Sequence, residues 1–148
     1  MTDEEFIDKI GKHVIKFAPE YGIECCSAII AQACLESGYG KSSLAVLAHN
    51  YFGVKLGSYT GDSITLNTQE EINGQLITIS DTFRKYAGIS EGVKGYFDVI
   101  SIPRYQNLKG IKDPQTYLET IKADGYCTDS KYVDKCMNLI SQWNLTRF

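Results

Sequence analysis

One carboxylate in this chain is notable for its position in a helical pattern. Residues 28–36 are typical of an apolar helix of small and aliphatic side chains, and Ser37-Gly38-Tyr39-Gly40 then ends it. At ~100° per residue, Glu36 shares a side with Ile29 and Ala33. Burial and the negative end of the helix dipole both disfavour a charged carboxylate there. We therefore expect Glu36 to keep its proton near neutral pH, as a general acid must. The alternative is a glutamate that ends the helix in solvent.

A second pair of carboxylates lies in a predicted hairpin. Residues 63–68 and 75–79 alternate as strands do, and Asn73-Gly74 between them is a strong hairpin-turn signal. If the strands lengthen toward the turn, they include Glu70 and Glu71, whose side chains then point to opposite faces. Only one of the two can face a given cleft, and the alternative for both is a solvated position.

Two carboxyl groups on separate elements beside a cleft can cleave a glycosidic bond. One protonates the leaving oxygen, and the other, ionised, activates water or stabilises the developing positive charge. Glu36 on an apolar helix and Glu70 on a polar hairpin lie in unlike environments. Such a difference gives two carboxyl groups opposite protonation states.

Helical spacing and capping signals predict the elements that must position these groups. The expected fold is α+β and mostly helical, a single domain over residues 1–148 with one inserted β-hairpin. The expected helices cover residues 3–18, with a capping box at Thr2 and Glu5; 24–37; 43–48, capped by Ser42 or Ser43; about 90–102, capped by Ser90; 113–123, capped by Asp113; and a last helix capped by Asp129 that runs to Trp143.

Composition and charge exclude several classes of function. Hydrophobic residues make up 43% of the chain, so it is not a disordered segment. The net charge is −3 and no run of Lys or Arg occurs, so we expect no nucleic-acid partner. No apolar run is long enough for a membrane span, and the acidic start is unlike a signal peptide, so we expect no membrane insertion.

Cysteine and aromatic content add two expectations. The five Cys residues include no CxxC pair, and neither His has a ligand partner nearby in sequence, so we expect free, mostly buried thiols from a reducing compartment and no zinc site. Ten Tyr, six Phe and one Trp offer flat faces that can bind sugars. We expect Phe6, Phe17, Phe97 and Trp143 to lie in the core instead.

Four blocks, in order, resemble glycoside hydrolase family 73, the glucosaminidase domain of bacterial and phage cell-wall lytic enzymes. The blocks are Ala31-Gln32-Ala33 running into Glu36-Ser37-Gly38-Tyr39-Gly40-Lys41-Ser42, then Asn50-Tyr51-Phe52-Gly53-Val54-Lys55, then 68–74 followed by Phe83-Arg84-Lys85-Tyr86, and finally Gly125-Tyr126-Cys127-Thr128-Asp129-Ser130-Lys131-Tyr132. Together they span nearly the whole chain. The resemblance implies a lysozyme-like helical fold.

The resemblance also assigns roles to single residues. It implies that Glu36 is the catalytic acid, that Glu70 is the hairpin glutamate taken as the base in several members, and that Tyr126 lines the cleft. Positions matching recurrent ones around the site, where we expect support or sugar contact, are Tyr39, Asn50, Phe52 and Tyr86. Phe52 could instead be packing, and Asn50 could tie a turn. Glu71 stands where the family often has an aromatic residue, which leaves the register between Glu70 and Glu71 open.

The implied reaction is hydrolysis of the β-1,4 bond after N-acetylglucosamine in peptidoglycan, without a metal or organic cofactor. Retaining, inverting and substrate-assisted mechanisms all stay open, and we expect a monomer. The rivals are a lytic transglycosylase, a catalytically silent glycan-binding module, and a structural helper of a secretion or tail apparatus. Without a signal peptide, we expect the chain to reach the bacterial cell wall by phage-type release, or to be an excised domain of a secreted autolysin.

Overall fold

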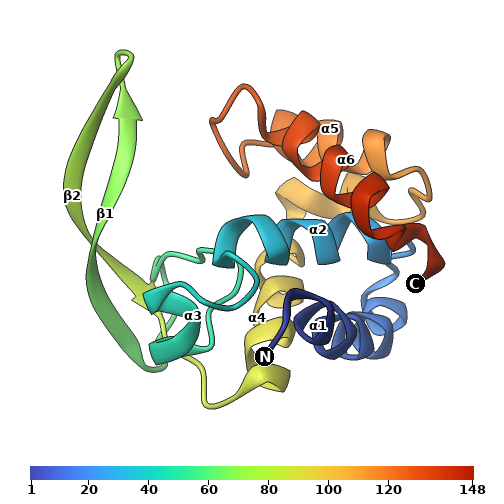
Figure 1. Cartoon of the computed structure of the whole chain (residues 1–148), viewed down its shortest axis with the longest axis horizontal. Helices are drawn as coiled ribbons and strands as arrows, with labels where there is room; N and C mark the ends of the chain where they lie inside the picture. The colour runs from blue at the N-terminus through green and yellow to red at the C-terminus, as the bar shows by residue number, and fades with distance from the viewer.

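The computed structural model describes all residues from Met1 to Phe148. Most of the chain is helical, and one two-stranded antiparallel hairpin stands beside the helices (Figure 1). The elements in order are α1 (Asp3–Phe17), η1 (Ala18–Tyr21), α2 (Cys26–Ser37), α3 (Ser43–Ala48), β1 (Ser63–Ile72), β2 (Gln75–Arg84), α4 (Ile89–Ile100), η2 (Pro103–Leu108), α5 (Pro114–Ala123), α6 (Tyr132–Trp143) and η3 (Leu145–Arg147). The predicted α+β, mostly helical class is confirmed.

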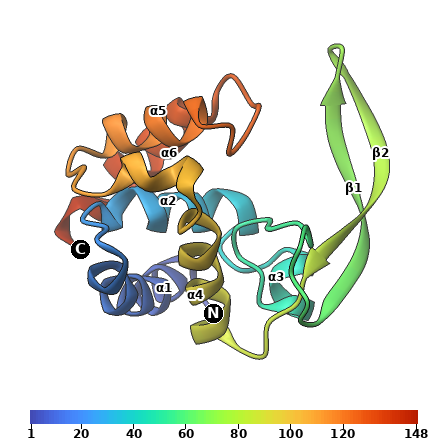
Figure 2. The ribbon, with the colours of Figure 1, turned by 180° about the vertical axis from the view of Figure 1, so that it is seen from behind.

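Helix α2 runs through the middle of the molecule and is surrounded by the other helices (Figures 1 and 2). Every residue from Ser27 to Cys34 is buried, because all of them except Ser27 and Gln32 are apolar and α1, α5 and α6 pack against this stretch. Ile29 and Ala33 are fully buried, whereas Glu36 is exposed, since the last turn of α2 leaves the core. The prediction that Glu36 shares their buried environment was therefore wrong.

The hairpin has the predicted turn and longer strands than the alternating segments alone. Its pairing runs from Ser63 opposite Arg84 to Ile72 opposite Gln75. Asn73 and Gly74 have φ of 52° and 78°, both left-handed, as a two-residue hairpin turn requires. The two strands cross in both views, so that β1 is nearer the helical body in the half of the hairpin toward the turn and β2 is nearer at the base (Figures 1 and 2). The residues that could carry the second carboxylate thus lie on the nearer strand.

Three of the predicted helix starts are confirmed and three are displaced; α2, expected from residue 24, begins at Cys26. Thr2 and Glu5 form the capping box of α1, and the side chains of Ser42 and Asp113 cap α3 and α5. Helix α4 begins after Gly88, before the predicted cap Ser90. Helix α6 begins after Lys131, because the Asp129 carboxylate accepts the Lys131 amide N–H at 2.9 Å in a turn ahead of the helix and caps nothing.

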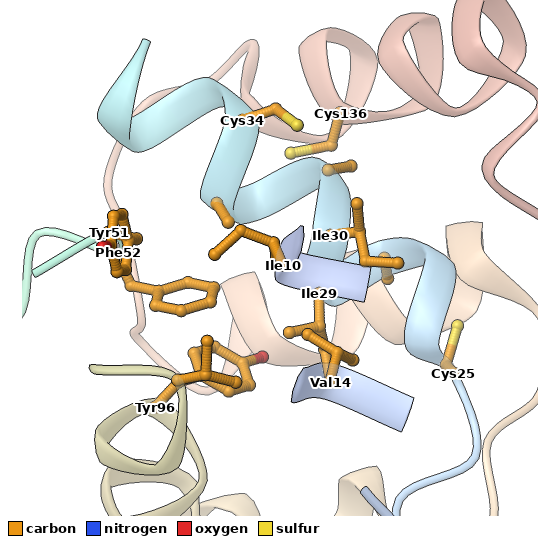
Figure 3. Packing of buried hydrophobic residues seen from close by; sticks show 14 of the residues in the cluster. Ile10, Val14, Cys25, Ile29, Ile30, Cys34, Tyr51, Phe52, Tyr96 and Cys136 are labelled. Carbon is orange, nitrogen blue, oxygen red and sulfur yellow. The ribbon is translucent and has the colours of Figure 1, made fainter. Parts of the chain in front are cut away.

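The core forms where α1, α2, α4, α5 and α6 meet, and Figure 3 shows part of it around α2. Phe6, Phe17 and Phe97 are buried as predicted, whereas Trp143 is only half-buried. All five cysteines are free, and Cys25, Cys34 and Cys136 are buried. None of the helices combines the length and the apolar character needed to cross a membrane.

Candidate active site

Glu36 lies where three segments meet at the end of α2. The turn after α3 approaches it so closely that a Cβ added to Gly53 would lie 3.5 Å from Glu36 Oε2. The loop before α6 and the first turn of α6 bring the charges of Asp129 and Lys135 to the same carboxyl. The side chain is exposed, but protein surrounds it on its other sides, so water reaches the carboxyl from one side only.

The pKa of Glu36 is raised from its ordinary value of 4.5 to about 7. The main cause is that surrounding protein replaces water around the carboxylate, and the negative charge of Asp129 adds to the rise. The positive charge of Lys135 opposes it. The direction of the shift agrees with the prediction, and so does its first cause, the loss of water around the carboxyl group.

Asp129 and Lys135 form an ion pair beside this acid, with 2.8 Å between Asp129 Oδ2 and Lys135 Nζ. The hydrogen bond from Lys135 and the amide N–H of Lys131 both lower the pKa of Asp129, so the group stays ionised. Sequence reasoning missed both members of the pair. Asp129 stood in a recognised block and was interpreted only as a helix cap.

Tyr126 brings an unused hydrogen-bond donor close to Glu36. Its hydroxyl oxygen is buried and has no hydrogen-bond partner, although a buried hydroxyl usually has one. Burial raises the pKa of Tyr126 well above its usual range, and the charge of Glu36 is the next cause. Its ring meets Tyr96 and Tyr105 edge-on, with centroids 6.1 and 6.2 Å away. The structure therefore brings Tyr126 to Glu36, as the resemblance implies.

Glu70 lies on the half-buried side of β1 and is bound to Lys55. Lys55 Nζ is 3.1 Å from Glu70 Oε1 and 2.9 Å from Asp81 Oδ2. These two hydrogen bonds, with Asp81 first, raise the pKa of Lys55. Lys55 belongs to the same turn as Gly53, so one short segment contacts both glutamates of the predicted pair.

Glu71 is exposed, and its negative charge acts on Lys135 of α6. The pKa of Lys135 is raised mainly by its hydrogen bond to Asp129, and the charges of Glu36 and Glu71 raise it further. Glu70 is thus tied to the turn at Lys55, and Glu71 is directed closer to α6. Both residues are on the strand nearer the helical body, so the choice between them needs a kinetic test.

Asn50 and Phe52 are inside the protein and support the site. Asn50 is 1% exposed, its amide donates to the carbonyls of Val54 and Arg84 at 2.9 Å each, and its Oδ1 accepts the Val54 N–H at 3.0 Å. These bonds join the turn that holds Gly53 to the end of β2. Phe52 is 3% exposed and its ring centroid is 4.6 Å from that of Tyr96 (Figure 3).

Tyr86 is buried and Tyr39 is half-buried, and other side chains hold both of them in place. Tyr86 is 7% exposed, and its unpartnered hydroxyl lies so close to Gly95 that a Cβ there would be 2.3 Å away. Tyr39 is half-buried with φ of 58°, and its hydroxyl accepts the Trp143 indole N–H at 3.0 Å. Of the candidate residues, the structure gathers Glu36 and Tyr126, with Glu70 linked through the turn.

Two cavities of about 480 Å³ each lie elsewhere in the molecule. One is between η1 and the end of α4, lined by Tyr21, Ile100 and Tyr105, and the other is between α1 and α3, lined by Phe6, Tyr39 and Tyr51. Neither includes Glu36. No cluster of three or more His, Cys, Asp or Glu side chains is arranged to hold a metal ion.

Comparison with known proteins decides the family. A sequence model described as "Glucosaminidase: Mannosyl-glycoprotein endo-beta-N-acetylglucosaminidase" matches residues 11–145. The chain belongs to this glucosaminidase family. Among solved structures, a peptidoglycan hydrolase mutant from Sphingomonas sp. A1 superposes on this glucosaminidase domain with a TM-score of 0.83, at 30% identity over 97% of this chain and 96% of that one. The catalytic domain of the autolysin Auto from Listeria monocytogenes superposes with a TM-score of 0.81, at 29% identity over 98% of this chain and 86% of that one.

Curated relatives match the glucosaminidase domain over only part of their own length. The exo-glucosaminidase LytG of Bacillus subtilis is 34% identical over 97% of this chain and 52% of that protein. The peptidoglycan hydrolase FlgJ of Pseudomonas aeruginosa is 30% identical over 94% of this chain and 36% of that protein. The chain thus spans about half, or less, of the curated relatives it matches.

Proposed function

We propose that this glucosaminidase domain hydrolyses the β-1,4 glycosidic bond after N-acetylglucosamine in bacterial peptidoglycan, with Glu36 as the general acid. The observation that carries the proposal is the pKa of Glu36, raised to about 7 at a position that solvent reaches. A carboxyl group that is protonated near neutral pH can donate to the glycosidic oxygen of the leaving sugar. Family membership makes peptidoglycan the substrate to test first.

The chain's own residues supply the remaining steps in our proposal. Glu36 gives its proton to the leaving oxygen, and the unpartnered Tyr126 hydroxyl is available to donate to the carboxylate left behind. Glu70, held by Lys55, activates water or stabilises the oxocarbenium-like charge. A separation of ~5–5.5 Å between the two carboxyl groups in the substrate complex would indicate retention, and ~6.5–9.5 Å inversion. The N-acetyl group of the substrate could also act as the nucleophile.

The exposed position of Glu36 suits a polymeric substrate. A closed pocket would take only a chain end or a small ligand, whereas a glycan strand must reach the acid along its length. We therefore propose that the domain acts on glycan strands of the bacterial cell wall, as a monomer. A silent glycan-binding module is disfavoured, because binding alone does not explain a carboxyl group with so high a pKa.

One finding favours a second bond specificity. A relative from Lactococcus lactis subsp. cremoris, 33% identical over 99% of this chain and 35% of that protein, is named a probable N-acetylmuramidase. Cleavage after N-acetylmuramic acid is therefore the alternative hydrolysis. A lytic transglycosylase is the third outcome, since it would need the acid but would add no water.

Product analysis separates these outcomes. Purified peptidoglycan is digested, reduced with borohydride and analysed by mass spectrometry. We expect reduced N-acetylglucosamine ends. Reduced N-acetylmuramic acid ends would indicate cleavage after N-acetylmuramic acid. An anhydro end, lighter by one water, would indicate a lytic transglycosylase. Glu36→Gln should abolish release of fragments, whereas Glu119→Gln, an exposed glutamate on α5, should not. Release by Glu36→Gln at the wild-type rate would refute the proposal.

A further inference from the structure

A chain of hydrogen bonds crosses the core one turn below Glu36. Gln32 precedes Glu36 by four residues, so both are on the same side of α2. The side chain of Gln32 is fully buried. Tyr96 Oη donates to Gln32 Oε1 at 2.7 Å, and Gln32 Nε2 donates to Tyr132 Oη at 3.0 Å. Both ends of the buried amide are therefore used.

The direction of the chain follows from its protons. Tyr96 gives its proton to Gln32, so at the 2.7 Å contact between the two tyrosine hydroxyls Tyr117 must be the donor. The order is then Tyr117, Tyr96, Gln32, Tyr132, with bonds that connect α5, α4, α2 and α6. A network whose members are all paired fixes one arrangement of the elements it connects.

The network ends at the part of α6 that faces Glu36. Tyr132 is the first residue of α6, Asp129 lies three residues before it and Lys135 three residues after it. Tyr132 is 2% exposed, and no other hydrogen bond in the network connects α6 to α2. The ion pair of Asp129 and Lys135 is thus held on a helix end that the Gln32–Tyr132 bond fixes to α2.

We propose that Gln32 is a positioning residue, which through Tyr132 holds the Asp129–Lys135 ion pair at a set place beside Glu36. The importance of this positioning for catalysis rests on the proposed role of Glu36. The positioning itself can be measured without an activity assay. The titratable groups around Glu36 come from the loop before α6 and from α6 itself: Tyr126, Cys127, Asp129, Tyr132, Lys135 and Cys136. The turn on the other side presents Gly53, which does not titrate.

The test reads the titration of Glu36 directly. Carbon-13 NMR of labelled glutamate side chains follows its carboxyl, assigned by the resonance that Glu36→Gln removes. Lys135→Met should raise the pKa of Glu36 by roughly half a unit, because a nearby cation is lost. In a Tyr132→Phe background, where the bond from Gln32 is cut, we expect this response to fall to less than half.

Tyr117→Phe is the matched control. It removes one hydroxyl from the same network but leaves the Gln32–Tyr132 bond, so the full response to Lys135→Met should remain. An equal response in the wild-type, Tyr132→Phe and Tyr117→Phe backgrounds would overturn the proposal. Gln32→Met should reduce the response to Lys135→Met as Tyr132→Phe does. If Gln32→Met does not fold, the result with Tyr132→Phe, which keeps its aromatic ring, tests the proposal. Wild-type activity of Glu36→Gln would refute the proposed function and leave this result standing.

Discussion

Glu36 at the end of α2 and Gly53 in the turn after α3 are in close approach, since a Cβ on Gly53 would lie 3.5 Å from Glu36 Oε2. Gly53 also has φ of 68°, a backbone conformation that glycine adopts without strain. The sequence Asn50-Tyr51-Phe52-Gly53 therefore both closes a turn and leaves room for the acid. An alanine at position 53 would add strain to the turn and place a methyl group in van der Waals contact with the carboxyl, where it displaces water.

Gly53→Ala should lower kcat on peptidoglycan about tenfold and destabilise the fold by about 1 kcal/mol. Gly57→Ala is the control, because Gly57 has a similar φ of 51° but lies near Arg84 and not Glu36. It should cost similar stability, measured by urea denaturation, and leave kcat near the wild-type value. Equal loss of kcat in both variants would show that backbone strain alone is responsible.

The two charges beside Glu36 should move the alkaline limb of the activity profile in opposite directions. Glu36 must be protonated to act, so activity should fall as the pH rises through about 7. Asp129→Asn removes the charge that raises the pKa of Glu36, and the limb should shift to lower pH. Lys135→Met removes the opposing charge, and the limb should shift to higher pH. Shifts of the same sign in kcat–pH profiles would contradict this account.

Stability should fall as the pH rises from about 4.5 to about 7 because of Glu36. The pKa of Glu36 is higher in the folded than in the unfolded state, so the folded state binds more protons in this pH window. The stabilisation that comes from protonated Glu36 is therefore lost as the pH rises through the folded pKa. Glu36→Gln cannot titrate, so the difference in Tm between variant and wild type should grow in favour of the variant from pH 4.5 to 7. If the difference in Tm between the two proteins did not change with pH, Glu36 would not be the group that titrates in this window.

The two hairpin glutamates should differ in their effect on activity. Glu70→Gln should lower kcat tenfold or more, because Glu70 is the carboxylate held by Lys55. Glu71→Gln should change kcat by less than threefold, and it serves as the control for register. Both variants should keep nearly the wild-type Tm, since Glu71 is exposed and Glu70 is only half-buried. A larger loss at position 71 would assign the second carboxylate to Glu71.

Much of the fold follows from local signals in the sequence. Asn73-Gly74 fixed the hairpin, and Thr2, Ser42 and Asp113 marked the starts of their helices, because each of these signals acts within three or four residues. Asp129 was misassigned for the same reason. An Asp ahead of an apolar stripe is equally suited to a cap and to a preceding turn, and only the position of Lys135 distinguishes them.

The environment of the site depends on contacts that local patterns do not contain. Periodicity could not tell that Glu36 leaves the core, because α2 is apolar on every side and has no polar face to mark the boundary. The network around Gln32 joins residues that are 64 and 100 positions apart. Lys55 was part of a recognised block, but its bonds to Glu70 and Asp81 depend on how the hairpin folds over the turn.

The burial of residues 27–34 of α2 has a consequence for how a polysaccharide could be accommodated. A helix enclosed by α1, α5 and α6 cannot shift without displacing all of them, so the backbone that carries Glu36 is held in place by the interior. The hairpin contacts the rest of the molecule at α3 and at Lys55, which binds Asp81 and Glu70. Any adjustment to strands of different thickness or cross-linking must therefore come from the hairpin, while the proton donor remains a fixed reference point.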